Sequence, residues 1–428
     1  MINDGLEKYR IYRRIICIDL KSFYASVECA DLGLDPFKTP LVVADKSRGD
    51  GSICLAVSPY LRNKGVPGRL RIFELPKGEN IIFCKPRMKR YLEASAKVVS
   101  IFLRYVSQED IYIYSVDESF LDFTDYKTLY PESNIKLAKR ISDEIYRETK
   151  LYCSCGIGPN MLLSKLAMDI EAKKTKNQIA EWTYEDVEKK LYSITPLSKM
   201  WGIGRRYEAT LNKMGYKKVG DIAKADPTIF KKRFGILGEE LWHHTHGIDM
   251  SLIQDKKKFK PLSKSYGVGQ VMFEDYNKDT SSEIILEMAD DLSSRLRQTK
   301  KKTKTIHLSI GYNQTYGGGF SRQMKLKEPI NLGKDIQKAC LELFDKYYNG
   351  EPIRRFQISV SGLVDDSGLQ LSLFEDKEKK SKEEKLLDTM DEIKKKYGKN
   401  SIRRASTELE YSTAKKRNQE VGGHHEWI

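Results

Sequence analysis

The sequence lacks any long uninterrupted hydrophobic run. Its longest apolar stretches, such as residues 15–18, have the length of a buried strand, whereas a membrane-spanning helix needs about 20 predominantly apolar residues. Residues 1–10 are charged rather than apolar, so no secretory signal is expected. We therefore expect no association with a membrane.

Cysteine and histidine are both sparse, with seven and six residues in a chain of 428. None of the cysteines forms a Cys-x-x-Cys pair, and their number is odd, which indicates reduced intracellular thiols rather than a disulfide framework. A cluster of histidines, His243, His244 and His246, has no neighbouring cysteine or acidic cluster. A polar helix end is expected there rather than a metal site.

What the sequence does have is an excess of basic residues, with a formal net charge of +15. Such an excess suits a polyanionic partner, because neutralising phosphates releases condensed counterions. A generally basic protein without such a partner explains the charge equally well. The charge alone therefore does not identify a function.

The first 180 residues alternate strand-like and helix-like segments. The hydrophobic pattern predicts strands over residues 14–19, 40–44, 52–57, 111–116, 119–123 and 152–157. It predicts helices over residues 22–30, 86–106 and 133–150, and another that begins near Asn160. This mixture predicts an α/β core with helices packed on a sheet.

A second α/β unit is predicted after a short basic linker. Between the two units, residues 181–250 read as short helices with glycine turns. The second unit has strands near 266–272, 304–312, 320–326 and 355–362, with helices near 281–297 and 332–348. The order β-α-β-β-α-β indicates a split βαβ module. The charged end of the chain carries one amphipathic stretch, to which we assign no chemistry: Leu386, Leu387, Met390, Ile393 and Tyr397.

Three carboxylates are candidates for metal chemistry. Asp19 follows an apolar strand, where a buried carboxylate is costly unless it binds a cation or caps a helix. Asp117 and Glu118 are adjacent, and adjacent side chains on a strand face opposite ways. Both could reach one ion only at the apex between two short strands, where they would form an oxygen-rich Mg²⁺ site with Asp19. A helix cap and a solvated turn remain alternatives for the two segments taken singly.

Together these segments resemble the Y-family translesion DNA polymerases, the bacterial UmuC and DinB type of the ImpB/MucB/SamB family. The resemblance implies that Asp19, Asp117 and Glu118 hold two Mg²⁺ ions, helped by the Leu20 main-chain carbonyl. One ion would activate the primer 3′-hydroxyl, and the other would hold the triphosphate and stabilise the leaving pyrophosphate.

The resemblance also assigns residues to the incoming nucleotide: Phe23, Tyr24, Arg62 and Lys165. Tyr24 matches the aromatic steric gate, which leaves no room for a 2′-hydroxyl and so selects deoxynucleotides. Without the resemblance, Tyr24 is a core residue of an amphipathic helix, and the two basic residues are surface charges. The chain departs from the family pattern at Pro59, where many members have a phosphate-binding Tyr, and at Lys21, where Asp or Asn is usual.

Two further segments point to DNA and to a protein partner. Gly202, Ile203 and Gly204 precede a predicted helix and resemble a helix-hairpin-helix turn, whose main chain approaches a DNA phosphate. A plain helix-turn-helix packing motif is the alternative. A second motif matches the bacterial sliding-clamp peptide, Gln-Leu-x-Leu-Phe, in which apolar anchors fit a groove; it consists of Gln370, Leu371, Ser372, Leu373 and Phe374.

The expected architecture is an α/β (α+β) right-hand polymerase with a ferredoxin-like palm, small fingers, a helical thumb and a βαββαβ little finger. The expected ranges are 11–180 for palm and fingers (fingers about 29–80), 181–250 for the thumb, 251–262 for the linker, 263–365 for the little finger, and 366–428 for the clamp peptide and tail.

The expected function is transfer of deoxynucleotides to a primer end opposite damaged template, in the cytoplasm at the nucleoid. The expected partners are primer-template DNA, deoxynucleoside triphosphates and the sliding clamp, with a UmuD-like accessory protein as a further candidate. Two alternatives stay open. One is a catalytically weak or partner-dependent DNA- and clamp-binding protein, and the other is a different two-metal enzyme such as a nuclease.

Overall fold

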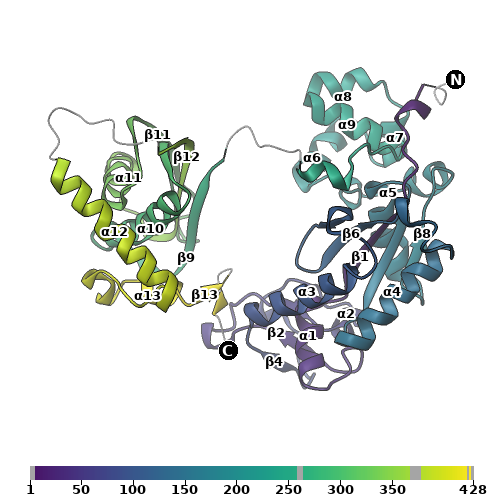
Figure 1. The fold of residues 1–428 in the computed structure, drawn as a ribbon, viewed down its shortest axis with the longest axis horizontal. Coiled ribbons are helices and arrows are strands. Elements are labelled where there is room, and N and C mark those ends of the chain that lie inside the picture. The colour runs from purple at the N-terminus through teal and green to yellow at the C-terminus, as the bar shows by residue number, and fades with distance from the viewer. Residues whose placement is uncertain (1–4, 258–263, 367–376, 422–423, 426–428) are drawn as a thin grey trace. The chain divides into compact units, whose positions relative to one another are not determined.

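The computed structural model describes residues 5–257, 264–366, 377–421 and 424–425. The chain divides into two compact units, residues 1–259 and residues 260–426, and each is described by itself (Figure 1). The predicted clamp peptide, residues 370–374, lies outside the described residues.

Unit 1 is built on a five-stranded sheet in the order β5-β6-β1-β7-β8. Its strands are β1 (Ile15–Leu20), β5 (Ile111–Ile113), β6 (Glu118–Asp122), β7 (Cys153–Gly158) and β8 (Ile179–Glu181). The central strand β1 pairs antiparallel with both β6 and β7. The order and directions of β5, β6, β1 and β7 are those of a ferredoxin-like sheet, so the predicted palm fold is confirmed.

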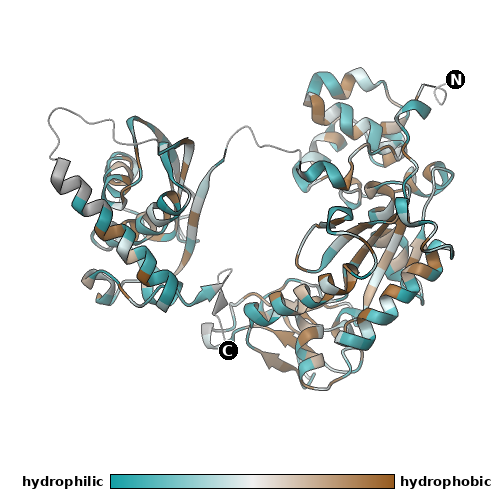
Figure 2. Cartoon of the chain, viewed as in Figure 1, coloured by the Kyte–Doolittle hydropathy of each residue, from teal (hydrophilic) through white to brown (hydrophobic). Residues whose placement is uncertain are grey.

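The two faces of this sheet are covered by different helices. Alternate residues of β1 point to opposite faces: Ile16 and Ile18 join one buried cluster, while Ile15 and Cys17 join another. The first cluster is packed by α1 (Phe23–Asp31), α3 (Met88–Phe102) and α4 (Asn134–Thr149). The second is packed by α5 (Met161–Leu166) and the π-helix Ala167–Glu171. Figure 2 shows the apolar character of the sheet strands against the mixed character of the covering helices.

A small separate sheet follows α1. Strands β2 (Leu41–Val43), β3 (Ala56–Val57) and β4 (Ile82–Cys84) enclose a core with α2 (Pro59–Asn63). Strand β3 is shorter than the segment 52–57 that the pattern predicts. Ile53 makes only an isolated bridge to Arg71, and its side chain is exposed, so the chain joins the sheet only near the end of this segment.

Four short helices form the end of unit 1. They are α6 (Arg205–Lys213), α7 (Val219–Ala223), α8 (Pro227–Phe234) and α9 (Ile236–Thr245). The ring nitrogens of His243 and His246 lie against main-chain carbonyls of α9. The short helix Ile253–Lys257 lies in the predicted linker, yet it packs on the palm: Ile253 is buried, and Gln254 donates to Asp110 at 2.7 Å.

Unit 2 has the predicted β-α-β-β-α-β order. Its elements are β9 (Tyr266–Tyr276), α10 (Lys278–Gln298), β10 (Lys301–Tyr312), β11 (Gly319–Ile330), α11 (Gly333–Tyr347) and β12 (Ile353–Asp365). The sheet order is β11-β10-β12-β9 and all neighbours are antiparallel, so β12 splits the β9-α10-β10 crossover. The core lies between this sheet and the two helices.

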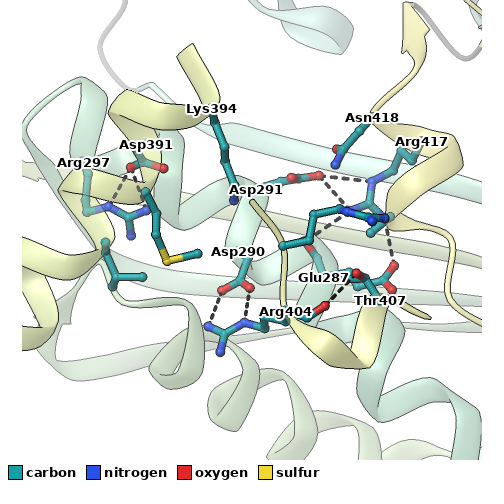
Figure 3. Close-up of a pocket in the computed structure, with 14 residues that line it drawn as sticks. Glu287, Asp290, Asp291, Arg297, Asp391, Lys394, Arg404, Thr407, Arg417 and Asn418 are labelled. Carbon is teal, nitrogen blue, oxygen red and sulfur yellow. Dashed lines mark hydrogen bonds and ion pairs between the residues drawn. The ribbon is translucent and has the colours of Figure 1, made fainter. Parts of the chain in front are cut away.

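The end of the chain packs on α10. It contains α12 (Lys377–Tyr397), α13 (Ala414–Arg417), β13 (Glu420–Val421) and β14 (His424–His425). Figure 3 shows the ion pairs that hold it: Arg297 to Asp391 at 2.8 Å, Arg404 to Asp290 at 2.6 Å, and Arg417 to Asp291 at 2.9 Å. Of the predicted amphipathic stretch, Leu387, Met390 and Ile393 are partly buried, whereas Leu386 and Tyr397 are exposed.

None of the helices in the described ranges is both long and apolar enough to cross a membrane.

Candidate active site

Strand pairing brings the three predicted carboxylates to one end of the palm sheet. Asp19 of β1 stands opposite Glu118 of β6 in the antiparallel register. Asp117 precedes β6, and its carbonyl accepts the Leu20 N–H at 2.8 Å. Asp117 therefore belongs to the turn between β5 and β6 rather than to a strand. This position removes the conflict that adjacent strand residues would face opposite ways.

A serine holds the turn that carries Asp117. The Ser115 hydroxyl donates to Asp117 Oδ1 at 2.6 Å and accepts the Glu118 N–H at 3.1 Å. The main-chain N–H groups of Tyr114 and Ser115 both donate to the Glu118 carbonyl at 3.0 Å. The turn is thus closed on both its main chain and its side chains, so Asp117 and Glu118 are held in position before any ligand binds.

Two lysines neutralise these carboxylates. Lys165 Nζ lies 2.6 Å from Glu118 Oε1 and 3.1 Å from Asp169 Oδ2. Lys173 Nζ lies 2.6 Å from Asp19 Oδ2 and 2.7 Å from Asp169 Oδ1. Asp169 therefore bridges the two ammonium groups. Asp169 and Lys173 were not predicted from the sequence, although Asp169 lies four residues after Lys165 and Lys173 four residues after Asp169, the spacing of neighbours on one helical face.

Burial governs the protonation of this cluster. Desolvation raises the pKa of Asp19 to about 6; Lys173 lowers it, and the charges of Asp117 and Glu118 raise it further. Burial also raises the pKa of Asp169, but Lys173 and Lys165 outweigh it and hold that pKa below its ordinary value. The site therefore has a low local dielectric, in which each charge is felt strongly by its neighbours.

The cluster fits a divalent cation in donor chemistry and in charge. Its ligands are all carboxylate oxygens, which hard cations such as Mg²⁺ prefer. Its four carboxylates exceed the two lysines by two negative charges. Within the described ranges, however, no three His, Cys, Asp or Glu side chains are gathered closely enough to hold a metal ion. Asp19 and Glu118 are each paired with a lysine instead.

The position of Lys165 depends on a close approach between β7 and α5. A Cβ atom on Gly156 would lie 2.0 Å from the Ser164 carbonyl oxygen, far inside van der Waals contact. Only glycine permits this approach. The Asn160 side chain caps α5 by accepting the Leu163 N–H at 2.9 Å. These two residues fix where the first turns of α5 lie, and with them the lysine.

The predicted steric gate, Tyr24, lies at the start of α1. Its ring centroid is 4.6 Å from that of Tyr91, whose hydroxyl donates to Glu28 at 2.6 Å. Arg87 holds the same carboxylate through two hydrogen bonds of 3.0 and 2.7 Å. Burial raises the pKa of the Tyr24 hydroxyl, and the negative charge of Asp117 raises it further. Phe23 is buried in the core.

The structure does not bring Arg62 to the carboxylates. It lies on α2, is exposed, and its Nη1 donates to the Val66 carbonyl at 2.9 Å. Pro59 stands at the first turn of α2 and is buried. Another basic residue of this region, Arg69, has a charge that lowers the pKa of Tyr24.

The predicted DNA-binding turn precedes α6. Gly202 has a φ of +91°, a conformation that favours glycine. Ile203 is buried and its N–H donates to the Met200 carbonyl at 3.1 Å. Gly204 is the N-cap of α6, which begins with the exposed Arg205. A helix N-terminus with adjacent arginines suits a phosphate.

The chain is similar to known proteins over most of its length. Profiles of the impB/mucB/samB family, its C-terminal domain and the IMS family HHH motif match residues 18–169, 263–373 and 184–216. The protein UvrX of Bacillus subtilis (strain 168), provisionally named for UV-damage repair, is 41% identical over 96% of this chain and 97% of its own length. DNA polymerase IV 2 of the same strain is 33% identical over 96% of this chain and 98% of its own length.

A solved structure shares the fold. The Y-family DNA polymerase chimera Dbh-Dpo4(243-245)-Dbh superposes with a TM-score of 0.65 at 21% identity, over 82% of this chain and 99% of that chain. This chain belongs to the impB/mucB/samB family of Y-family DNA polymerases. The membership confirms the resemblance that the motifs indicated, and with it the enzyme class, a DNA-directed DNA polymerase.

Proposed function

We propose that this chain adds deoxynucleotides to a primer opposite damaged template by a two-metal-ion mechanism, and that the sliding clamp recruits it. The observation that carries the catalytic part is the meeting of Asp19, Asp117 and Glu118 at one end of the palm sheet. Family membership supports translesion synthesis as the broader activity.

The carboxylates of Asp19, Asp117 and Glu118, with the Leu20 carbonyl, would hold two Mg²⁺ ions. When bound, the ions supply activation of the 3′-hydroxyl and neutralisation of the triphosphate and the leaving pyrophosphate. Lys165 would bind the triphosphate; in the described state its ammonium neutralises Glu118 and Asp169. Its pKa stays above the ordinary value despite burial because of these carboxylates, so it remains a cation.

Other residues would position the substrates. The ring of Tyr24 would exclude a 2′-hydroxyl, with Phe23 as the buried residue behind it. Arg62 would reach the triphosphate from α2, which requires its bond to the Val66 carbonyl to break. The turn at Gly202, Ile203 and Gly204 would bind a DNA phosphate without reading sequence.

Residues 370–374 would bind the sliding clamp, because their Leu and Phe anchors fit an apolar groove. A UmuD-like accessory protein is a further proposed partner. The nucleoid is the proposed place of action, since the DNA substrate is there.

One observation favours the alternative of a catalytically weak or partner-dependent protein. Asp19 and Glu118 each pair with a lysine, so metal binding must compete with two ion pairs in a buried site. A partner that moves α5 or the π-helix would weaken that competition.

Primer extension with the purified protein tests the proposal. We expect Mg²⁺- and template-dependent extension, including past a lesion, that Asp117→Ala/Glu118→Ala abolishes. The matched control is Glu185→Ala/Glu188→Ala, which removes two exposed carboxylates of the same unit and should retain extension. Failure of the wild type to extend a tightly bound primer-template, even with clamp, would favour the weak or partner-dependent alternative.

Primer extension in the presence of the sliding clamp tests the second part of the proposal. Leu373→Ala/Phe374→Ala should lose stimulation by the clamp while retaining extension without it. Leu386→Ala, which truncates an exposed leucine of the tail, is the control. Equal stimulation of all three proteins would contradict the clamp-binding role of residues 370–374.

A further inference from the structure

Trp201, the residue before the Gly-Ile-Gly turn, packs both on the palm and on the hydrophobic cluster of the helices that follow it. Its ring stacks on Phe120 with centroids 5.9 Å apart and an interplanar angle of 26°. Phe120 is fully buried and lies two residues after Glu118 in β6. The indole N–H of Trp201 donates to the Tyr114 hydroxyl at 3.2 Å. The turn is thus attached to the strand that carries a catalytic carboxylate.

Tyr114 continues this path to the active site. The Lys165 ammonium lies 5.4 Å from the centroid of the Tyr114 ring, within the range of a cation–π interaction. The same ammonium pairs with Glu118, and the Tyr114 N–H donates to the Glu118 carbonyl. Tyr114 therefore contacts both members of the Lys165–Glu118 pair while its hydroxyl accepts from Trp201.

We propose that Trp201 and Tyr114 are positioning residues that link the DNA-binding turn to the Lys165 ammonium. A phosphate bound at Gly202 and Gly204 would hold Trp201, the indole hydrogen bond would hold the Tyr114 ring, and the ring would hold Lys165 for the triphosphate. Coupling of this kind travels through contiguous packed and hydrogen-bonded groups. The inference rests on the proposed roles of Lys165 and of the turn.

The path predicts a specific kinetic pattern for conservative variants. Trp201→Phe keeps a stacked ring but loses the indole N–H, and Tyr114→Phe keeps the ring face under Lys165 but loses the hydroxyl. Each should lower kcat/KM for single-nucleotide incorporation by roughly three- to tenfold, the worth of one hydrogen bond. The kcat/KM of the double variant should fall no further than that of the weaker single variant, because both substitutions remove the same hydrogen bond between Trp201 and Tyr114.

Primer-template Kd and thermal stability separate positioning from a merely structural role. Both should stay near the wild-type values in the two Phe variants, while only kcat/KM for nucleotide incorporation decreases. Tyr112→Phe is the matched control. Tyr112 stacks on the same Phe120, and the variant also loses one hydroxyl. Its kcat/KM for incorporation should equal that of the wild type. Tyr114→Leu removes the ring face and should raise KM for the nucleotide.

Several outcomes would overturn the proposal. Additive losses in the double variant, losses accounted for by DNA Kd, or full activity of both Phe variants would each reject the link. Lys165→Met, measured alongside, identifies which assumption failed. If it leaves the nucleotide KM unchanged, the proposed role of Lys165 is wrong and the link fails with it. If it raises KM while the Phe variants are silent, only the link fails.

Discussion

At the scale of single residues, the active site is a balance of buried charges. Lys165 and Glu118 are both about nine-tenths buried, with side-chain exposures of 10% and 11%. Removing one member of such a pair leaves the other as an uncompensated buried charge, which costs more than the pair contributes. Lys165 therefore neutralises a buried carboxylate of the palm. Its second role, binding of a triphosphate, is the one that we propose.

The proposed steric gate also depends on single residues, because Tyr24 packs on Tyr91, which is held in turn by Glu28 and Arg87. If Tyr24 is the gate, Tyr24→Ala should reduce the preference for deoxy- over ribonucleotides by at least about tenfold, since the ring proposed to block the 2′-hydroxyl is gone. The measurement is the ratio of kcat/KM for paired deoxy- and ribonucleoside triphosphates.

Tyr24→Phe keeps the ring and loses the hydroxyl, so it tests the two groups separately. Its preference for deoxy- over ribonucleotides should equal that of the wild type. An unchanged ratio in Tyr24→Ala would show that another group excludes the ribose hydroxyl, whereas a loss in Tyr24→Phe would assign the discrimination to a hydrogen bond.

At the scale of elements, the turn before α6 combines a backbone conformation that favours glycine with two anchors. Met200 and Ile203 are buried in the helical core, while Trp201 lies on the palm. Gly202 between them has a φ of +91°. The turn is thus fixed on both sides, which suits its proposed role of holding a DNA phosphate.

Gly202→Ala should weaken primer-template binding. A side chain at this φ costs about 1–3 kcal/mol, and relief of the strain would move the main chain that faces the phosphate. We expect Kd to rise by roughly three- to tenfold, measured by fluorescence anisotropy on one duplex at fixed salt.

Gly215→Ala is the matched control. Gly215 has a φ of +99°, and neither glycine has an atom within 4 Å of an added Cβ, so the two substitutions impose similar strain without a clash. Gly215→Ala should lose stability but keep DNA affinity. If both substitutions weakened DNA binding equally, the loss of affinity would follow from reduced stability and not from the turn at Gly202.

At the scale of the whole molecule, unit 2 is completed by residues far away in sequence. The Glu287 carboxylate of α10, only 1% exposed, accepts from Thr413 at 3.1 Å and pairs with Arg417 at 3.5 Å. Arg417 also pairs with Asp291. The tail to which the sequence assigned no chemistry therefore satisfies a buried charge of the little-finger unit.

Arg417→Met should destabilise unit 2 by about 2–4 kcal/mol, because it leaves Glu287 buried without its cation. Denaturant unfolding, with amide exchange in α10 as the local probe, measures the loss. Lys415→Met, which replaces an exposed neighbour, should have little effect.

The loss of stability in Arg417→Met should depend on pH in a defined direction. Burial raises the pKa of Glu287 above its ordinary value, while Ser412 and Arg417 oppose that rise. A carboxyl with a raised folded pKa costs stability when it is ionised, and the cost vanishes as pH falls and it protonates. Without Arg417 the pKa rises further, so the destabilisation should be smaller at acidic than at alkaline pH. If the destabilisation by Arg417→Met were independent of pH, its cause would be lost packing rather than the lost ion pair.

Much of the fold could be predicted from the sequence because its signals are local. Strand and helix periodicity placed β1, α3 and α4 close to their observed bounds, and the order of elements in unit 2 was read correctly. The segment 52–57 was less predictable. Whether an apolar stretch pairs in a sheet depends on the strand that reaches it, and only Ala56 and Val57 pair with β2.

The sequence by itself determined which residues could do chemistry here: Asp19 at a strand end, the Asp117–Glu118 pair, and Lys165 on the helix after β7. Residue type and spacing along the chain single out the carboxylates, because they reflect local geometry, whereas Lys165 was assigned only through the family resemblance. Only the tertiary structure decided that Asp169 bridges two lysines, that Trp201 reaches Tyr114, and that Arg417 neutralises Glu287. These contacts join residues through packing in three dimensions, and charges buried together must find partners wherever the fold supplies them.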